Sequence, residues 1–181
     1  LVQKCWTSWQ YHNSDWEITF LDKENIYEYI DIKSVLEDRT TRIYPVTQSE
    51  IIRINLLEKY GGVWVDATCF CQQPLDNWIY DYLDSGFFAF NRPGKDRMLS
   101  SWFLAATPYN KLVKIYCKEV NNFWLTNKTI KAWIDKPLVH QIILRFKIHG
   151  YLKNNPTLWF HPIITKVIRI YPYFWFFYLF Y

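Results

Sequence analysis

The segment over residues 47–69 constrains the fold of this chain more than any other, because a helix, a turn and a strand follow one another closely there. A capping box that ends at Glu50 predicts a helix over residues 48–59, and two glycines follow where helices commonly end. Alternating β-branched residues predict a strand over 63–69, with Asp66 near its C-terminal end. An apolar strand that delivers a carboxylate at this end is where open α/β sheets place ligand sites.

Aromatic side chains are the second constraint, because they make up 20% of this 181-residue chain. This content fits a deep core, a cleft that stacks sugars or bases, or a membrane-facing surface. The net charge is only +4, and the chain lacks the dense stripe of Lys and Arg that is typical of nucleic-acid-binding proteins. We therefore expect no nucleic-acid partner. The cysteines at positions 5, 69, 71 and 117 lack zinc-site spacing, and we expect reduced thiols in a cytoplasmic protein.

The rest of the chain alternates strand and helix patterns without an internal repeat, which indicates one α/β domain over residues 1–181. Two further strands are predicted, over residues 16–21 and 86–90. Helices are expected over residues 23–30, 31–40, 74–84, 97–106, 109–126 and 129–148. The aromatic run over 171–181 is too short to span a bilayer, and three interpretations stay open: a buried strand, an interfacial anchor, or the start of a longer segment.

Four residues of the central segment form a candidate site: Asp66, Thr68, Glu50 and Arg53. A carboxylate at a strand end can bind Mg²⁺ or Mn²⁺, and such a metal bridges phosphate oxygens. Arg53 can donate charge-assisted hydrogen bonds to phosphate, and Glu50 can accept hydrogen bonds from sugar hydroxyls. Together these groups suit a nucleotide-diphosphate sugar.

Each of these residues also has a purely structural interpretation. Glu50 completes the capping box, and Asp66 can cap the turn that follows. Arg53 can pair with Glu50, Glu58 or Asp66 on the surface. Trp64 shares a strand face with Asp66, where it serves equally well as a core residue or as a platform for a sugar.

The same segment resembles the central motif of the capsular polysaccharide synthesis proteins, a family related to the family 32 glycosyltransferases with a DXD-type sugar-binding region. The family pattern is approximately S-D-x-x-R-x-x-x-L-x-x-x-G-G-[VI]-[WY]-x-D-x-[DT]. This chain matches it at Ser49, Arg53, Leu57, Gly61, Gly62, Val63, Trp64, Asp66 and Thr68. The likeness is strongest over residues 49–68, extends weakly from the start to residue 90, and fades after about residue 125.

The resemblance implies a GT-A-like (Rossmann-like) nucleotide-sugar-binding domain that lacks its first N-terminal strand. It also implies a retaining glycosyltransferase that uses a nucleotide-sugar donor and a glycan or lipid-linked saccharide acceptor, in the synthesis of a surface or capsular polysaccharide. By this analogy Asp66 lies at the metal and diphosphate, Arg53 contacts the donor, and Glu50 contacts ribose or sugar, with Trp64 and Thr68 also in the donor site. The implied location is the cytoplasm, with peripheral contact at the cytoplasmic face of the membrane.

Two positions depart from the family pattern. Glu50 replaces the usual aspartate before the arginine, and Thr68 replaces the second acid of the DXD motif. A hydroxyl is a weak cation ligand, so an Mn²⁺ or Mg²⁺ ion has Asp66 as its single clear carboxylate. The alternative function is a truncated, non-catalytic relative of such an enzyme that associates with glycans or with a membrane.

Three residues outside the central segment complete the candidate set. Asp22 and Asn25 follow the predicted strand over 16–21, where they either cap a helix or contact the ribose of a donor. His140 lies among apolar residues. It is either packed in the core or, as in relatives, close to the acceptor or diphosphate.

Overall fold

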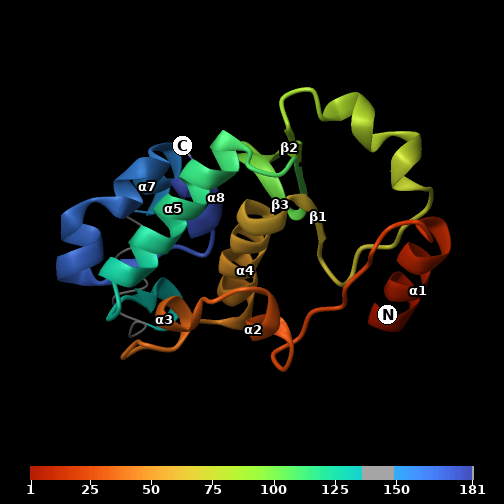
Figure 1. Ribbon diagram of the computed structural model, residues 1–181. Helices are drawn as coiled ribbons and strands as arrows, with labels where there is room; N and C mark the ends of the chain where they lie inside the picture. The colour runs from red at the N-terminus through yellow and green to blue at the C-terminus, as the bar shows by residue number, and fades with distance from the viewer. Residues whose placement is uncertain (136–148, 181) are drawn as a thin grey trace.

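The structure is a computed structural model that describes residues 1–135 and 149–180. Figure 1 shows a small sheet near the middle of the molecule, with the first helix on one side and most of the remaining helices on the other. The helical elements are α1 (Val2–His12), α2 (Ile26–Tyr29), α3 (Lys33–Leu36), α4 (Pro45–Tyr60), η1 (Leu75–Asn77), η2 (Ile79–Tyr82), α5 (Lys111–Thr126), η3 (Trp133–Asp135), α7 (His149–Asn154), η5 (Pro156–Phe160), η6 (Ile163–Ile168) and α8 (Trp175–Leu179).

The sheet is antiparallel and its strand order is β1-β3-β2. Its strands are β1 (Gly62–Val65), β2 (Phe87–Gly94) and β3 (Arg97–Ala106), and a short parallel pair forms separately between β4 (Lys131–Ala132) and β5 (Ile170–Tyr171). The mixed α/β class is therefore confirmed among the described residues. The principal sheet is antiparallel, whereas the sheet of a Rossmann-like unit is mostly parallel, so the finer GT-A prediction is not established by these strands.

Strand β3 corrects the helix predicted over residues 97–106. This segment ends in an apolar run over residues 102–106, and a short run of this kind does not distinguish a buried strand from a buried helix. It becomes a strand because a tight turn at residues 95–96 folds it back against β2, and β1 pairs with its other edge. The prediction of a strand over 86–90 is confirmed, and that strand extends to Gly94.

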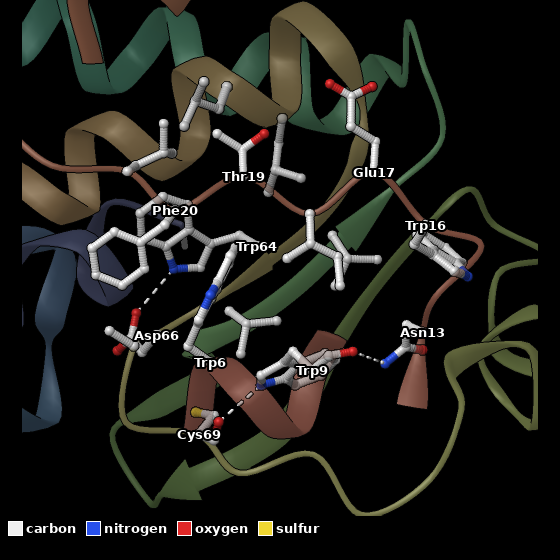
Figure 2. Close-up of a pocket in the computed structure, with 18 of the residues that line it drawn as sticks. Trp6, Trp9, Asn13, Trp16, Glu17, Thr19, Phe20, Trp64, Asp66 and Cys69 are labelled. Carbon is white, nitrogen blue, oxygen red and sulfur yellow. Dashed lines mark hydrogen bonds between the residues drawn. The ribbon is translucent and has the colours of Figure 1, made fainter. Parts of the chain in front are cut away.

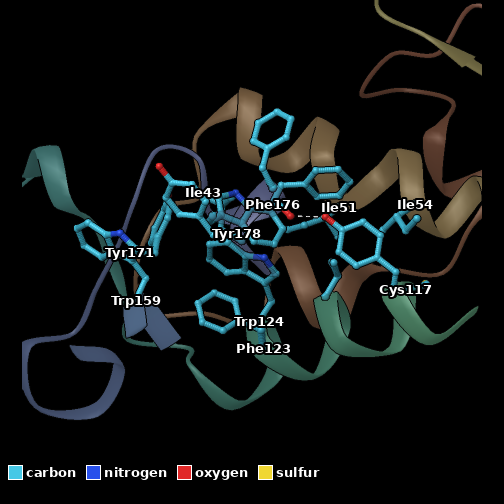
Figure 3. Packing of buried hydrophobic residues seen from close by; sticks show 14 of the residues in the cluster. Ile43, Ile51, Ile54, Cys117, Phe123, Trp124, Trp159, Tyr171, Phe176 and Tyr178 are labelled. Atoms are coloured by element: carbon cyan, nitrogen blue, oxygen red, sulfur yellow. Dashed lines mark hydrogen bonds between the residues drawn. The ribbon is translucent and has the colours of Figure 1, made fainter. Parts of the chain in front are cut away.

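The two faces of the sheet meet different surroundings. Leu104 and Ala106 of β3 belong to the large core formed with α4, α5 and α8, part of which Figure 3 shows. Phe103 and Ala105 belong to a second, smaller cluster with η1, η2 and residues of α1. Alternation along a strand produces this division, and it places Val63 and Val65 of β1 with the smaller cluster and Trp64 with the large one, as the alternation predicted.

Helix α4 begins earlier than its predicted start at residue 48. Pro45 occupies its first turn, where a missing N–H costs nothing, and no side chain caps the helix. The predicted capping box is therefore wrong, and Thr47 and Glu50 lie buried within the helix. The helix ends at Gly61, which has a φ of 67° and a backbone environment in which a Cβ would lie 2.7 Å from the Pro108 nitrogen.

Several other elements differ from the prediction. Residues 16–21 form no strand, because this segment and β1 line the same cavity instead of pairing. The strand predicted over 63–69 ends at Val65, and residues 66–69 form a turn that removes Asp66 and Thr68 from a common strand face.

The predicted helices also differ in length and type. The helices predicted over 23–30 and 31–40 shorten to α2 and α3, and residues 74–84 form the short helices η1 and η2. The helix predicted over 109–126 is confirmed as α5. The helix predicted over 129–148 gives way at its start to β4 and η3, and its remainder lies outside the described residues.

Most of the described part of the aromatic C-terminal run is buried: Tyr171 belongs to the short strand β5, and Trp175–Leu179 form helix α8, while Tyr173 is exposed. Trp175, Phe176 and Tyr178 of α8 lie in the large core, and the Tyr178 hydroxyl donates a 2.6 Å hydrogen bond to Asp96 in the β2–β3 turn. None of the helices in the described part of the chain is long and apolar enough to cross a bilayer. All four cysteines are free thiols, in agreement with the prediction.

Candidate functional site

A cavity of about 800 Å³ extends along the outer edge of the sheet, a volume typical of ligand sites. Strand β1 and the turn over residues 66–69 form one wall, and helix α1 and residues 16–21 form the other. Figure 2 shows Trp6, Trp9, Trp16, Phe20, Trp64 and Asp66 around this space. Because β1 is an edge strand, the cavity occupies the position that a neighbouring strand would take.

Asp66 is held in place at this cavity by its backbone and by its side chain. Its N–H donates a 2.8 Å hydrogen bond to the Trp102 carbonyl of β3, and its carbonyl accepts one from Cys69 that closes the turn. Carboxylate atom Oδ1 accepts a 2.9 Å hydrogen bond from the Trp64 indole and lies 3.2 Å from the Arg53 guanidinium. The carboxylate remains 36% exposed, so an oriented negative charge meets the cavity.

Arg53 lies behind this carboxylate and is only 2% exposed. Its Nε donates to the Ser49 carbonyl at 3.1 Å, one terminal nitrogen donates to the Ser49 hydroxyl at 2.8 Å, and the other donates to the Ser101 carbonyl of β3. The guanidinium also lies 5.2 Å from the Trp64 ring. Arg53 is thus fixed by protein groups and is not among the described residues that line the cavity, while its predicted contact with a donor stays a prediction.

Glu50 is buried one turn from Arg53 and is also absent from the described cavity lining. Burial raises the pKa of Glu50 to about 8, against the opposing effects of the Arg53 charge and the Trp175 indole. Burial likewise lowers the pKa of Arg53, which the charges of Asp66 and Glu50 oppose. At neutral pH the raised pKa leaves a proton on Glu50, and the carboxylate that pairs with Arg53 is that of Asp66.

The described lining of the cavity is acidic, because it includes Glu17 and Asp66 and no lysine or arginine. An anionic ligand therefore needs a cation here, and Mg²⁺ is commonly held by one or two carboxylates together with substrate phosphates. Asp66 fits that role, because both contacts shown for its carboxylate fall on Oδ1 and leave Oδ2 available. Among the described residues, no group of three or more His, Cys, Asp or Glu side chains is arranged to hold a metal ion.

Aromatic residues near the N-terminus form the wall that sequence reasoning missed. Trp6 and Phe20 meet edge to face with ring centroids 5.5 Å apart, and Trp9 donates a 2.8 Å hydrogen bond to the Cys69 carbonyl just beyond the Asp66 turn. The Asn13 side chain also bonds to Leu75 N–H at 2.7 Å, which attaches the end of α1 to the same loop. The available signal was the density of aromatic residues before residue 21, with Trp6 and Trp9 one helical turn apart.

The remaining predicted residues lie in different places. Thr68 is exposed in the turn and lines the cavity with Asp66. Asp22 and Asn25 bond to one another's backbone and brace the start of α2, with Asn25 also donating to the Phe20 carbonyl at 2.8 Å. Neither belongs to the described cavity lining, and their contact with ribose stays a prediction. His140 lies outside the described residues.

The fold and the cavity define a mixed α/β protein in which the carboxylate of Asp66 faces a large cavity lined by aromatic rings. The model of the capsular polysaccharide synthesis protein family matches residues 1–156, so the chain belongs to this family. The family predicted from residues 49–68 is confirmed, and the match continues past residue 125, where the likeness was expected to fade.

A curated relative adds to this assignment. O-glycosyltransferase braB of Annulohypoxylon truncatum is 25% identical to this chain over an alignment that covers 71% of the chain and 34% of that protein. The chain therefore spans about a third of the length of that relative. No solved structure matches the chain.

Proposed function

We propose that this chain is a hexosyltransferase-like glycosyltransferase that moves a sugar from a nucleotide-sugar donor to a growing surface or capsular polysaccharide. The observation that carries this proposal is the position of Asp66, whose carboxylate meets the cavity at the end of β1 and is oriented by Arg53 and Trp64. Membership of the capsular polysaccharide synthesis family and the relative named as an O-glycosyltransferase support the same reaction class.

The residues of the cavity take separate roles in this proposal. Asp66, with Thr68 beside it, would hold a divalent cation, and a cation held there would supply positive charge toward a donor diphosphate. The rings of Trp6, Phe20 and Trp64 provide stacking surfaces for the base and the sugar. Arg53 is a positioning residue, because it contacts the Asp66 carboxylate from inside the core and holds it in place.

Transfer is proposed to retain the anomeric configuration. The acceptor hydroxyl oxygen forms a bond to the anomeric carbon on the face from which the diphosphate leaves, while the bond from that carbon to the diphosphate oxygen breaks. The hydroxyl proton passes to the departing diphosphate. The aromatic walls limit access of water to this carbon, which favours transfer to a sugar over hydrolysis.

The finer fold assignment, a GT-A-like architecture, forms part of the proposal. Its support is the succession of α4, the glycine turn and β1, which ends at the cavity carboxylate. A crystal structure with a nucleotide sugar bound at Asp66 tests both the architecture and the site.

Donor binding and turnover test the function directly. Calorimetry of the purified protein with UDP- and GDP-sugars plus Mn²⁺ is expected to show saturable binding. Asp66→Asn is expected to reduce sugar transfer by at least about 100-fold, the usual effect of losing one preorganised electrostatic contact. The fold should survive, because the amide keeps the shape of the carboxylate; circular dichroism serves as the check. Turnover by this variant at the wild-type rate contradicts the proposal.

The same experiment separates the enzyme from a glycan-associated relative without catalysis. The specific observation in favour of that alternative is that the turn after β1 offers the cavity a single carboxylate, Asp66, with Thr68 beside it. Absence of binding for every donor tested, together with binding of glycans, is the result that favours it.

A further inference from the structure

A second cavity, of about 640 Å³, adjoins the first on the face of the sheet that carries Phe103. Strands β2 and β3 form its floor, and the loop over residues 69–73 with η1 and η2 forms its sides. Trp9, Cys69 and Leu75 line both cavities. The 2.8 Å hydrogen bond from the Trp9 indole to the Cys69 carbonyl is therefore part of the wall between them.

Two aromatic rings that stack on one another line the floor of the second cavity. Phe90 and Trp102 stack with ring centroids 4.7 Å apart and an interplanar angle of 15°, and they remain 39% and 41% exposed. Trp78 lies beside them, 6.4 Å from Phe90, and Phe70 and Tyr82 add exposed rings at the rim. Exposed rings that are already ordered by one another offer a stacking surface at little entropic cost.

Polar groups of one kind accompany these rings. The amide side chains of Gln72, Gln73 and Asn91 line the cavity, are exposed, and make no hydrogen bond to other residues in the described part of the chain. No Asp, Glu, Lys, Arg or His occurs among its described lining residues. The first cavity contains two carboxylates, so the two adjoining sites differ in charge.

We propose that this second cavity binds the uncharged saccharide part of the acceptor. A pyranose ring has an apolar C–H face for the Phe90–Trp102 surface and hydroxyls that amides both donate to and accept from. Its position fits this role, because Cys69 in the shared wall is only three residues from Asp66. The assignment of the bound sugar as the acceptor rests on the proposed function. A chain of isoprene units is the competing occupant, and the free amides disfavour it because a lipid would leave them unpaired.

Binding of neutral sugars without any donor tests this assignment. The purified protein is titrated with linear trisaccharides of glucose, mannose, galactose and N-acetylglucosamine, and with farnesol as the lipid probe. Saturation-transfer NMR reports binding and tryptophan fluorescence reports affinity. We expect at least one trisaccharide to bind saturably, and Trp102→Ala to weaken that binding by about fivefold to tenfold.

Two further variants keep the test specific to the second cavity. Gln73→Ala is expected to weaken the same binding without altering the melting temperature. This variant tests the cavity independently if Trp102→Ala does not fold. The matched control is Trp6→Ala, because Trp6 lines the first cavity and is absent from the described lining of the second. It should leave trisaccharide affinity unchanged and weaken binding of a nucleotide sugar.

The outcomes separate this inference from the proposed function. Donor binding without binding of any trisaccharide, or competition for the second cavity by farnesol alone, overturns the inference and leaves the proposed function standing. Saccharide binding that depends on Trp102, in a protein that binds no donor, supports the assignment of the cavity and contradicts the proposed function.

Discussion

The two faces of the sheet use aromatic residues in opposite ways. On the helical face, Trp124, Trp175 and Phe176 are almost completely buried, and Trp124 meets Trp175 edge to face at 5.0 Å. On the opposite face, Phe90 and Trp102 stack on one another and stay well exposed along a cavity. The high aromatic content of the chain therefore serves two purposes: packing on one face and ligand surface on the other.

One connected set of side chains joins the two faces. Glu50 and Arg53 lie in α4 on the helical face, and Arg53 reaches Asp66, which faces the first cavity. Trp64 belongs to the helical core and also donates to Asp66. Residues of the packed face therefore hold the Asp66 carboxylate in place where it meets the first cavity.

The largest expected effect tests this contrast with one residue type on each face. Trp175→Ala removes a fully buried indole, and we expect a loss of about 3–5 kcal/mol in the free energy of unfolding. Trp102→Ala removes an exposed indole with one stacked neighbour, and we expect a loss below about 1.5 kcal/mol. Urea denaturation of both variants measures the difference, and equal losses contradict the contrast.

The next effect concerns Glu50, the buried acid one helical turn from Arg53. Burial raises the pKa of Glu50 to about 8 in the folded protein from an ordinary value of 4.5, so raising the pH between these two values favours the unfolded state. Relative to Glu50→Gln, the wild type should therefore lose about 1.4 kcal/mol of stability for each pH unit in this window, and no more above it. Urea denaturation of both proteins across the window gives the difference, and a difference that does not change with pH rules out a buried, protonated Glu50.

A smaller loss of stability is expected from changes in the glycine turn between α4 and β1. Gly61 has φ 67° and ψ −148°, a region essentially restricted to glycine, so Gly61→Ala should cost about 1–3 kcal/mol, and contact with the backbone at Pro108 adds to this. Gly62→Ala is the matched control, because its φ of 82° is equally unfavourable while a Cβ there meets nothing within 4 Å. Thermal denaturation should rank Gly61→Ala as the less stable variant, and the reverse order contradicts the steric argument.

The sequence allowed the local parts of this arrangement to be predicted, because their signals are local. The helix end at the glycine pair and the strand that starts beside it were predicted, whereas the strand ends at Val65 and Asp66 lies in the turn just beyond it. The role of Glu50 was partly obscured, because a threonine three residues earlier imitates a capping box, while Pro45 actually starts the helix. The pairing of Arg53 with Asp66 was considered only as a surface contact, and the structure shows the guanidinium buried.

The parts that the sequence did not reveal depend on contacts between distant segments. Residues 97–106 form a strand because β1 and β2 flank them, and no local pattern reports those neighbours. Residues 16–21 alternate as a strand does, yet a cavity occupies the space where a partner strand would lie. The wall that contains Trp6 and Trp9 arises because α1 packs against a loop about 60 residues away in the chain.

The smallest expected loss of stability tests the attachment of α1 to the open face, the face of the sheet that carries Phe103 and the second cavity. Trp9→Phe keeps an aromatic ring between the two cavities and removes only the indole N–H, which donates to the Cys69 carbonyl at 2.8 Å. One partly buried hydrogen bond contributes about 1 kcal/mol, so the free energy of unfolding should fall by about that amount. Hydrogen exchange should show faster opening of α1 and of residues 69–75, with α4 and α5 unchanged. Equal acceleration on both faces would mean that the open face has no independent stability, and the division of the molecule at the sheet would then be wrong.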